Sequence, residues 1–103
     1  MTEASSPLRV GLMGAGWFGR EAHLRNLLKI PGVSVVAASS RSDASLEAAR
    51  AIAGEQLQTH HDWRDVLQHE LDAVIIALTN DQHCEATMEA LDRNLHVLCE
   101  KPL

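Results

Sequence analysis

Gly14-Ala15-Gly16-Trp17-Phe18-Gly19 is the stretch that decides the fold of this 103-residue chain. It directly follows a short apolar run, Leu8 to Met13, which is predicted to be a buried strand. From Trp17 to Lys29, apolar residues recur at helical spacing, so we expect a helix after the glycines. A strand, a glycine turn and a helix in this order are the context in which a GxGxxG pattern predicts dinucleotide binding rather than an ordinary turn.

Each glycine of this turn has its own predicted role. Gly14 allows the tight turn off the strand, Gly16 leaves room for a pyrophosphate, and Gly19 lets the first helix lie close to the sheet. Because no Ser, Thr, Asp or Asn caps this helix, its first amide groups, near Trp17 and Phe18, are predicted to receive an anion with the help of the helix dipole.

The residues at the end of the second predicted strand indicate which dinucleotide the chain binds. An Asp or Glu there would accept hydrogen bonds from the ribose 2′-OH of NAD, but this chain has Ser39, Ser40 and Arg41. A hydroxyl and a guanidinium can hold a 2′-phosphate, so the sequence favours NADP(H) over NAD(H). In the alternative interpretation, Ser40 and Ser42 are turn residues and Arg41 is a solvated surface charge. Separately, Asp43 lies close enough to be the missing acid if the loop is bent.

The rest of the chain alternates strands with helices. The predicted strands are Leu8–Met13, Val33–Ser39, Leu57–Thr59, Asp72–Leu78 and a buried Leu95–Cys99, and the later helices are Asp43–Ala53, Trp63–Gln68 and Asp81–Arg93. This alternation predicts an α/β fold, a Rossmann-type doubly wound parallel sheet of about five strands in the order 3-2-1-4-5. Residues 1–7 are expected to be a flexible tail, and residues 8–103 a single dinucleotide-binding domain.

Charge and hydropathy limit the class of partner. The formal net charge is −5 at pH 7 and no stretch gathers Lys or Arg, which argues against nucleic acid and anionic membranes. The longest apolar run, Ala73 to Leu78, is far shorter than the roughly 20 residues of a spanning helix, and no signal peptide is recognised. We therefore expect a cytoplasmic protein whose partner is a small molecule.

The cysteines, and the histidines outside the motifs, are predicted to be structural. Cys84 and Cys99 are expected to be reduced and buried like small apolar residues. His60 and His61 are adjacent and cannot easily face one ion, so no metal site is predicted. Trp63 is expected to be a packing anchor of its short helix. On the helix predicted over Asp81–Arg93, Cys84, Met88 and Leu91 are expected to share one apolar face, with Thr87 and Ala90 beside them.

Polar residues follow the fourth and fifth predicted strands, at the edge where such sheets bind ligands. Thr79 and Asn80 can offer hydroxyl and amide groups to a ribose or nicotinamide, although Asn80 or Asp81 could equally be only a helix cap. His83 lies in the first turn of the following helix and could face the cleft or solvent. The fifth strand runs into Glu100-Lys101-Pro102, a charged pair before a proline.

Three segments together resemble the Gfo/Idh/MocA family, which includes glucose-fructose oxidoreductase and inositol dehydrogenase. They are the glycine turn, Thr79-Asn80-Asp81-Gln82-His83, and His96-Val97-Leu98-Cys99-Glu100-Lys101-Pro102-Leu103. The similarity runs from Leu8 onward, in register with the family's N-terminal nucleotide-binding domain, and Glu-Lys-Pro is its most specific mark. The family often has Thr-Pro-Asn where this chain has Leu78-Thr79-Asn80.

The resemblance implies an NAD(P)-dependent oxidoreductase that transfers hydride to or from a sugar, cyclitol or similar polyol. Lys101 would be the catalytic residue beside the nicotinamide, and Glu100 would contact the nicotinamide side of the cofactor. Asn80 and His83 would match the family's Asn and His after the fourth strand. The full set of predicted cofactor-binding residues is Gly14, Gly16, Trp17, Phe18, Gly19, Ser40, Arg41, Thr79, Asn80, His83, Glu100 and Lys101.

Family members continue beyond this length into a mainly antiparallel domain that supplies the substrate pocket. We therefore expect the C-terminal substrate domain to be absent, so that the chain binds NADP(H) weakly and turns over nothing alone. Loss of that domain would expose an apolar face, which predicts self-association. Two alternatives remain: a non-catalytic NAD(P)-binding or interaction module, and a structural fragment that no longer holds a cofactor.

Overall fold

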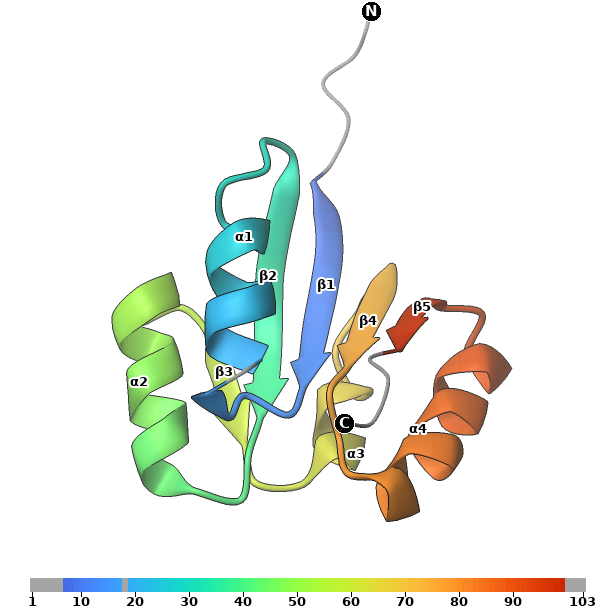
Figure 1. Cartoon of the computed structure of the whole chain (residues 1–103). Helices are drawn as coiled ribbons and strands as arrows, with labels where there is room; N and C mark the ends of the chain where they lie inside the picture. Colours follow the sequence, from blue (N-terminus) through green and yellow to red (C-terminus); the bar gives the residue numbers. More distant parts are fainter. Residues whose placement is uncertain (1–6, 18, 100–103) are drawn as a thin grey trace, which may run out of the picture.

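Five parallel strands form one sheet in the order β3-β2-β1-β4-β5 (Figure 1). The structure is a computed structural model that describes residues 7–17 and 19–99. Most of the predicted tail, Phe18 and residues 100–103, which include Glu100 and Lys101, lie outside the described residues. The strands are β1 (Leu8–Met13), β2 (Val33–Ser39), β3 (Gln58–His60), β4 (Ala73–Ile76) and β5 (His96–Cys99). The predicted fold class and strand order are confirmed.

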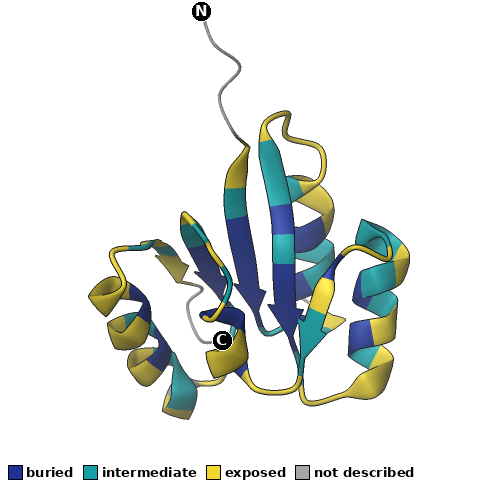
Figure 2. Cartoon of the chain, turned by 180° about the vertical axis from the view of Figure 1, so that it is seen from behind, coloured by how far each residue is buried: buried dark blue, intermediate teal, exposed yellow. Residues whose placement is uncertain are grey.

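Helices cover both faces of the central strands, which explains why these strands are continuously apolar. On one face, Leu12 of β1 and Ile75 of β4 belong to a core that also contains Leu24 and Ala49 from the first two helical segments. On the other face, Met13, Ala37 and Ile76 pack with Trp63 and Val66 of the third helix and Ala86 and Ala90 of the fourth. Figure 2 shows this burial along the central strands.

Two of the helices begin after a side chain that caps their first turn. The helix α2 (Asp43–Ala53) follows Ser42, whose Oγ accepts a hydrogen bond of 3.2 Å from the amide of Ser45. It ends at Gly54, where φ is 109°, a backbone conformation that favours glycine. The helix α3 (Trp63–Val66) begins after Asp62, whose Oδ1 accepts a hydrogen bond of 2.9 Å from the amide of Arg64.

The first helical segment differs from the regular helix predicted over Trp17 to Lys29. A π-helical turn, η1 (Gly19–Leu24), leads into the short α1 (Arg25–Leu27). The wide turn lies where Gly19 packs against the backbone of Gly14, and such turns are often found beside functional sites. The segment ends with two hydrogen bonds, in which the amides of Lys29 and Ile30 donate to the carbonyl oxygens three residues earlier.

The helix α4 (Asn80–Asp92) buries only part of the face predicted for it. Met88 and Leu91 are 58% and 53% exposed, and Cys84 is exposed as well, whereas Ala86 and Ala90 are fully buried. The small alanine side chains let the helix backbone approach the sheet closely, so the larger side chains lie outside. After this helix, Asn94 has a φ of 62°, the left-handed conformation that often ends a helix.

The strand β5 is not buried as predicted. Leu98 pairs in register with Ile75, so it faces the side of the sheet that η1, α1 and α2 cover. Those helices lie over β1 and β2, away from β5 (Figure 1), and Leu98 is therefore 54% exposed. Cys99 is exposed too, so the prediction of two buried cysteines was wrong. Within the described part of the chain, no helix is long and apolar enough to cross a bilayer.

Candidate functional site

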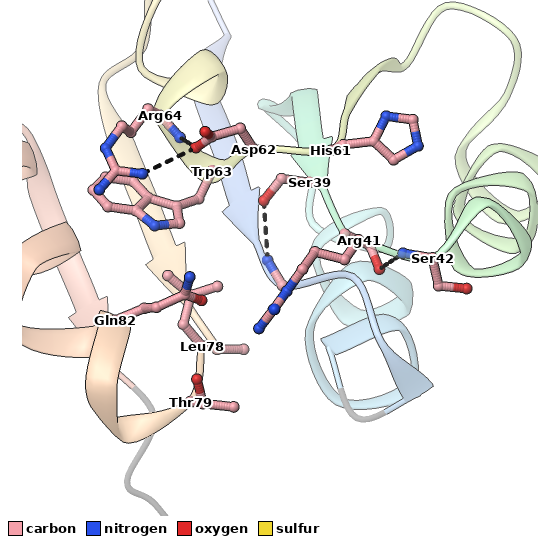
Figure 3. A pocket seen from close by; sticks show the side chains of 13 residues that line it. Ser39, Arg41, Ser42, His61, Asp62, Trp63, Arg64, Leu78, Thr79 and Gln82 are labelled. Atoms are coloured by element: carbon pink, nitrogen blue, oxygen red, sulfur yellow. Dashed lines mark hydrogen bonds and ion pairs between the residues drawn. The ribbon is translucent and has the colours of Figure 1, made fainter.

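A pocket of about 550 Å³ lies at the carboxyl ends of β1 to β4 (Figure 3). The segments that follow these four strands supply its walls, and α4 adds one side chain. The lining residues are Gly14, Ser39, Ser40, Arg41, Ser42, His61, Asp62, Trp63, Arg64, Ala77, Leu78, Thr79 and Gln82. Open parallel sheets bind ligands at this edge. The pocket thus brings together Gly14, Ser40, Arg41 and Thr79 from the predicted site.

The glycine turn has the stereochemistry that the sequence predicts. Gly14 has a φ of 99°, and a Cβ there would overlap the carbonyl oxygen of Ala77. A Cβ on Gly19 would overlap the carbonyl oxygen of Gly14, so the predicted close approach of the helix is confirmed. A Cβ on Gly16 would meet no atom of the described residues within 4 Å. The space beside Gly16 is therefore open to a ligand.

Two amides of the turn are already used to hold it against β2. Gly14 and Ala15 both donate to the carbonyl oxygen of Ser39, at 3.1 and 2.7 Å. Anion binding would therefore depend on the amides further along the turn, from Gly16 onward. Trp17 is 70% exposed and is not among the residues that line the pocket.

The segment after β2 presents hydrogen-bond donors to the pocket. The Ser40 Oγ accepts a hydrogen bond of 3.2 Å from the amide of Ser42, and the Ser42 Oγ accepts one from the amide of Ser45. Neither hydroxyl donates its hydrogen to another described residue, so both can donate to a ligand. Arg41 is exposed and makes no hydrogen bond or ion pair with another described residue. Its side chain reaches into the pocket (Figure 3). This wall therefore suits an anionic acceptor.

Unlike Ser40 and Ser42, Thr79 already donates its hydroxyl hydrogen to another side chain. Thr79 Oγ1 donates to Asp81 Oδ1 at 2.5 Å, and this bond, with the charge of Arg41 as a smaller cause, lowers the pKa of the Asp81 carboxyl. Thr79 also occupies the N-cap position of α4, so neither Asn80 nor Asp81 is the N-cap residue. What Thr79 can offer a ligand is an acceptor oxygen, which fits a sugar hydroxyl.

The sequence analysis missed the wall contributed by the β3–α3 segment. Trp63 is buried, as predicted, but it also lines the pocket, and the Arg64 guanidinium lies 4.4 Å from its ring centroid. Arg64 Nη2 is held by Glu85 Oε2 at 2.7 Å, which raises the pKa of this guanidinium. The signal that could have found this wall is topological: the segment follows a parallel strand at the same sheet edge as the glycine turn.

His60 and His61 have different partners. His60 Nε2 lies 2.8 Å from His69 Nε2, while His61 Nε2 lies 2.6 Å from Asp43 Oδ1. The two rings therefore do not converge on one ion, and no cluster of three metal-ligating side chains occurs among residues 7–17 and 19–99. Asp43, the alternative acid for an NAD ribose, is turned towards His61 and does not line the pocket.

Several predicted site residues are not brought to the pocket by the described structure. His83 does not line the pocket. Its backbone oxygen accepts a hydrogen bond of 2.8 Å from Thr87 Oγ1. The side chain of Asn80 and all of Phe18, Glu100 and Lys101 lie outside the described residues. Cofactor contact by these residues therefore stays a prediction.

Comparison with known proteins agrees with the geometry of this edge. Residues 8–103 match the model of the Gfo/Idh/MocA oxidoreductase family, described as an NAD-binding Rossmann fold. Inositol 2-dehydrogenase 4 of Saccharopolyspora erythraea is 41% identical over 99 residues, which are 93% of this chain and 28% of that protein.

Two solved structures of relatives carry different cofactors. The scyllo-inositol dehydrogenase from Lactobacillus casei, with bound NAD(H) and scyllo-inositol, matches with a TM-score of 0.81 and 31% identity, over 93% of this chain and 28% of that one. A 3-ketoreductase from Actinomadura kijaniata in complex with NADP matches with a TM-score of 0.80 and 29% identity, over 95% of this chain and 30% of that one.

This chain spans less than a third of the length of each of these relatives. Within that span, the family match, the strand order and the glycine turn all describe the same nucleotide-binding unit. The chain belongs to the Gfo/Idh/MocA oxidoreductase family and corresponds to its NAD-binding Rossmann domain.

Proposed function

We propose that residues 8–103 are the cofactor-binding domain of an NAD(P)-dependent dehydrogenase or reductase that acts on a sugar, cyclitol or similar polyol. The observation that carries the proposal is the pocket of about 550 Å³ at the carboxyl ends of β1 to β4, beside the glycine turn. Hydride transfer is the chemistry of the dinucleotide when it is bound, and the protein supplies binding and orientation.

We further propose that this site prefers NADP(H) to NAD(H). Arg41 supports this preference because its guanidinium reaches into the pocket without an ion-pair partner among the described residues. The hydroxyl groups of Ser40 and Ser42 can donate to the same phosphate, and no carboxylate of the β2–α2 segment lines the pocket. Because one compared relative binds NAD(H) and another binds NADP, the preference of this chain has to be measured directly.

The substrate class is proposed from the relatives rather than from this domain. Inositol and scyllo-inositol are named for two of the compared proteins, and both are cyclitols. In the proposed enzyme, Lys101 would position the substrate oxygen beside the nicotinamide, and Glu100 would contact the cofactor. The remaining part of the substrate pocket would come from a second domain.

Titration with NADPH and NADH tests the proposed cofactor. We expect NADPH to bind more tightly, and Arg41→Ser to weaken NADPH binding by about tenfold or more while leaving NADH almost unchanged, because a charge-assisted hydrogen bond is lost. Arg25→Ser is the matched control, since Arg25 pairs with Glu21 away from the pocket. Tighter binding of NADH by the unmodified chain would refute the preference.

A non-catalytic NAD(P)-binding module is the second candidate. It would use the same pocket and glycine turn to hold the dinucleotide, without hydride transfer. A steady-state assay with myo-inositol or scyllo-inositol and either oxidised cofactor separates the two. Substrate-dependent formation of reduced cofactor would support the enzyme, whereas one-to-one binding without turnover would support the module.

A further inference from the structure

Asp43 lies beside the pocket in the chain and has a side-chain partner, His61. It is the first residue of α2 and directly follows Ser42, which lines the pocket. In dinucleotide-binding domains, a carboxylate after the second strand binds the ribose 2′-OH of NAD, and its charge repels a 2′-phosphate. A carboxylate at Asp43 that is free to turn towards the pocket would therefore favour NAD(H).

The structure holds this carboxylate away from the pocket. Asp43 Oδ1 lies 2.6 Å from His61 Nε2, and because an ionised carboxylate only accepts hydrogen bonds, the ring nitrogen donates. His61 lines the pocket whereas Asp43 does not. Figure 3 shows the His61 ring on the side of the pocket where α2 begins.

The backbone fixes His61 beside the segment that is proposed to hold the phosphate. His60 pairs in register with Ser39, and the amide of Ser40 donates to the His60 carbonyl oxygen at 3.0 Å. His61 is the next residue along the chain. The imidazole is thus carried by the same strand pair that places Ser40 and Arg41 at the pocket.

We propose that the His61–Asp43 pair sets the cofactor preference of this site by keeping the Asp43 carboxylate away from the ribose 2′ position. The proposal rests on the proposed function, because it assumes that the pocket takes a dinucleotide. His61 is a positioning residue in this account, since it acts through Asp43. Both side chains are largely exposed, at 64% and 87%, so the pair is weak and its effect is a few-fold change rather than a complete switch.

The experiment measures the dissociation constants of NADH and NADPH and takes their ratio for each variant. His61→Ala removes the donor and frees Asp43, so we expect the preference for NADPH to fall by about threefold, the scale of an exposed ion pair. His61→Gln keeps a donor at nearly the same position and should retain most of the preference. Asp43→Asn added to His61→Ala should restore it, because the freed group no longer carries a charge.

Glu47→Gln is the matched control, since it removes an exposed carboxylate from the same helix one turn after Asp43. It should leave the ratio unchanged. A purely structural role of His61 would weaken the binding of both cofactors alike, so an unchanged ratio in His61→Ala would overturn the proposal. Failure of Asp43→Asn to restore the preference would overturn it as well.

The same titrations separate this inference from the proposed function. If the unmodified chain binds NADPH preferentially and His61→Ala does not change the ratio, only the role of the His61–Asp43 pair fails. If the unmodified chain binds neither cofactor while circular dichroism shows that it is folded, the proposed function fails and the inference fails with it.

Discussion

Leu12 in β1 and Leu98 in β5 belong to parallel strands of one sheet, yet Leu12 is fully buried and Leu98 is 54% exposed. The difference comes from the reach of the helices: η1, α1 and α2 cover β1 and β2, but none of them extends over β5 (Figure 1). We call β1, β2 and β4 the covered strands, and α4 with β5 the open edge.

The comparison separates two parts of the proposed cofactor site. The glycine turn and the Ser40–Arg41 segment follow covered strands, and they lie at one pocket together with Thr79, which follows β4. Glu100 and Lys101, which the family resemblance assigns to the nicotinamide side, follow β5 at the open edge. We therefore expect binding of the phosphates and the adenosine to depend on the covered strands, and substitutions can test this expectation.

The largest expected effect is on stability within the covered strands. Leu12→Ala should lower the free energy of unfolding by about 2–5 kcal/mol, because it removes buried contacts and leaves a cavity. Leu98→Ala should lower it by less than about 0.5 kcal/mol, as expected for an exposed side chain. Urea denaturation of both variants measures the difference. Equal losses would contradict the assignment of the two regions.

A pair of glycine substitutions should separate folding from binding. Gly19→Ala should destabilise the chain by about 1–3 kcal/mol, because its Cβ would overlap the Gly14 carbonyl oxygen, a backbone atom that cannot easily move. Gly16→Ala has open space around it, so stability should change by less than about 0.5 kcal/mol while NADPH binding weakens. Unfolding curves and cofactor titrations check the two results. Normal NADPH binding by Gly16→Ala would argue against pyrophosphate contact at this turn.

Self-association is expected to depend on the open edge. Met88, Leu91 and Leu98 are large apolar side chains that are each more than half exposed, which is unfavourable in water. Light scattering of the unmodified chain should therefore detect association that increases with concentration, and Leu98→Lys should reduce it. A molar mass equal to that of a monomer at every concentration would contradict this prediction.

The smallest effect concerns the pH dependence of stability. His69 Nε2 lies 2.8 Å from His60 Nε2, and burial, together with the charges of His60 and Arg9, lowers the pKa of His69. Since the folded chain then binds protons at His69 less readily than the unfolded chain, this contribution to stability is present above the ordinary histidine pKa of about 6.5 and is lost as the pH falls below it. We therefore expect the urea concentration at the unfolding midpoint to decrease as the pH is lowered from about 7 to about 5.

The non-titrating variant His69→Gln should show a shallower fall in these midpoints than the unmodified chain. His96→Gln, a change in an exposed histidine of the open edge, serves as the control with the same loss of one imidazole. A steeper fall in His69→Gln would contradict the direction assigned to the His69 pKa.

Local signals predicted most of the fold correctly. The bounds of β1 and β2 and of α2 agree with the sequence analysis, because a glycine turn, the Ser42 cap and Gly54 act through neighbouring backbone atoms. The strand order followed from the alternation of strands and helices. These features depend on contacts close in sequence or on topological rules, which a single sequence carries.

The errors came from features set by distant packing. The buried face of α4 is formed by Ala86 and Ala90 rather than by Met88 and Leu91, since the close approach of the helix to the sheet selects small side chains. The pocket wall of His61, Trp63 and Arg64 belongs to no short motif, because it is assembled only when β3 takes its place beside β2.

The central claim is that the pocket at the carboxyl ends of β1 to β4 binds an NAD(P) dinucleotide. Titration of ¹⁵N-labelled chain with NADPH, followed by amide chemical shifts, tests it most directly. We expect saturable shifts concentrated at Gly14, Gly16, Ser40, Arg41 and Thr79, with little change at Met88 and Leu91. Shifts confined to α4, or no saturable shifts with either NADPH or NADH, would contradict it.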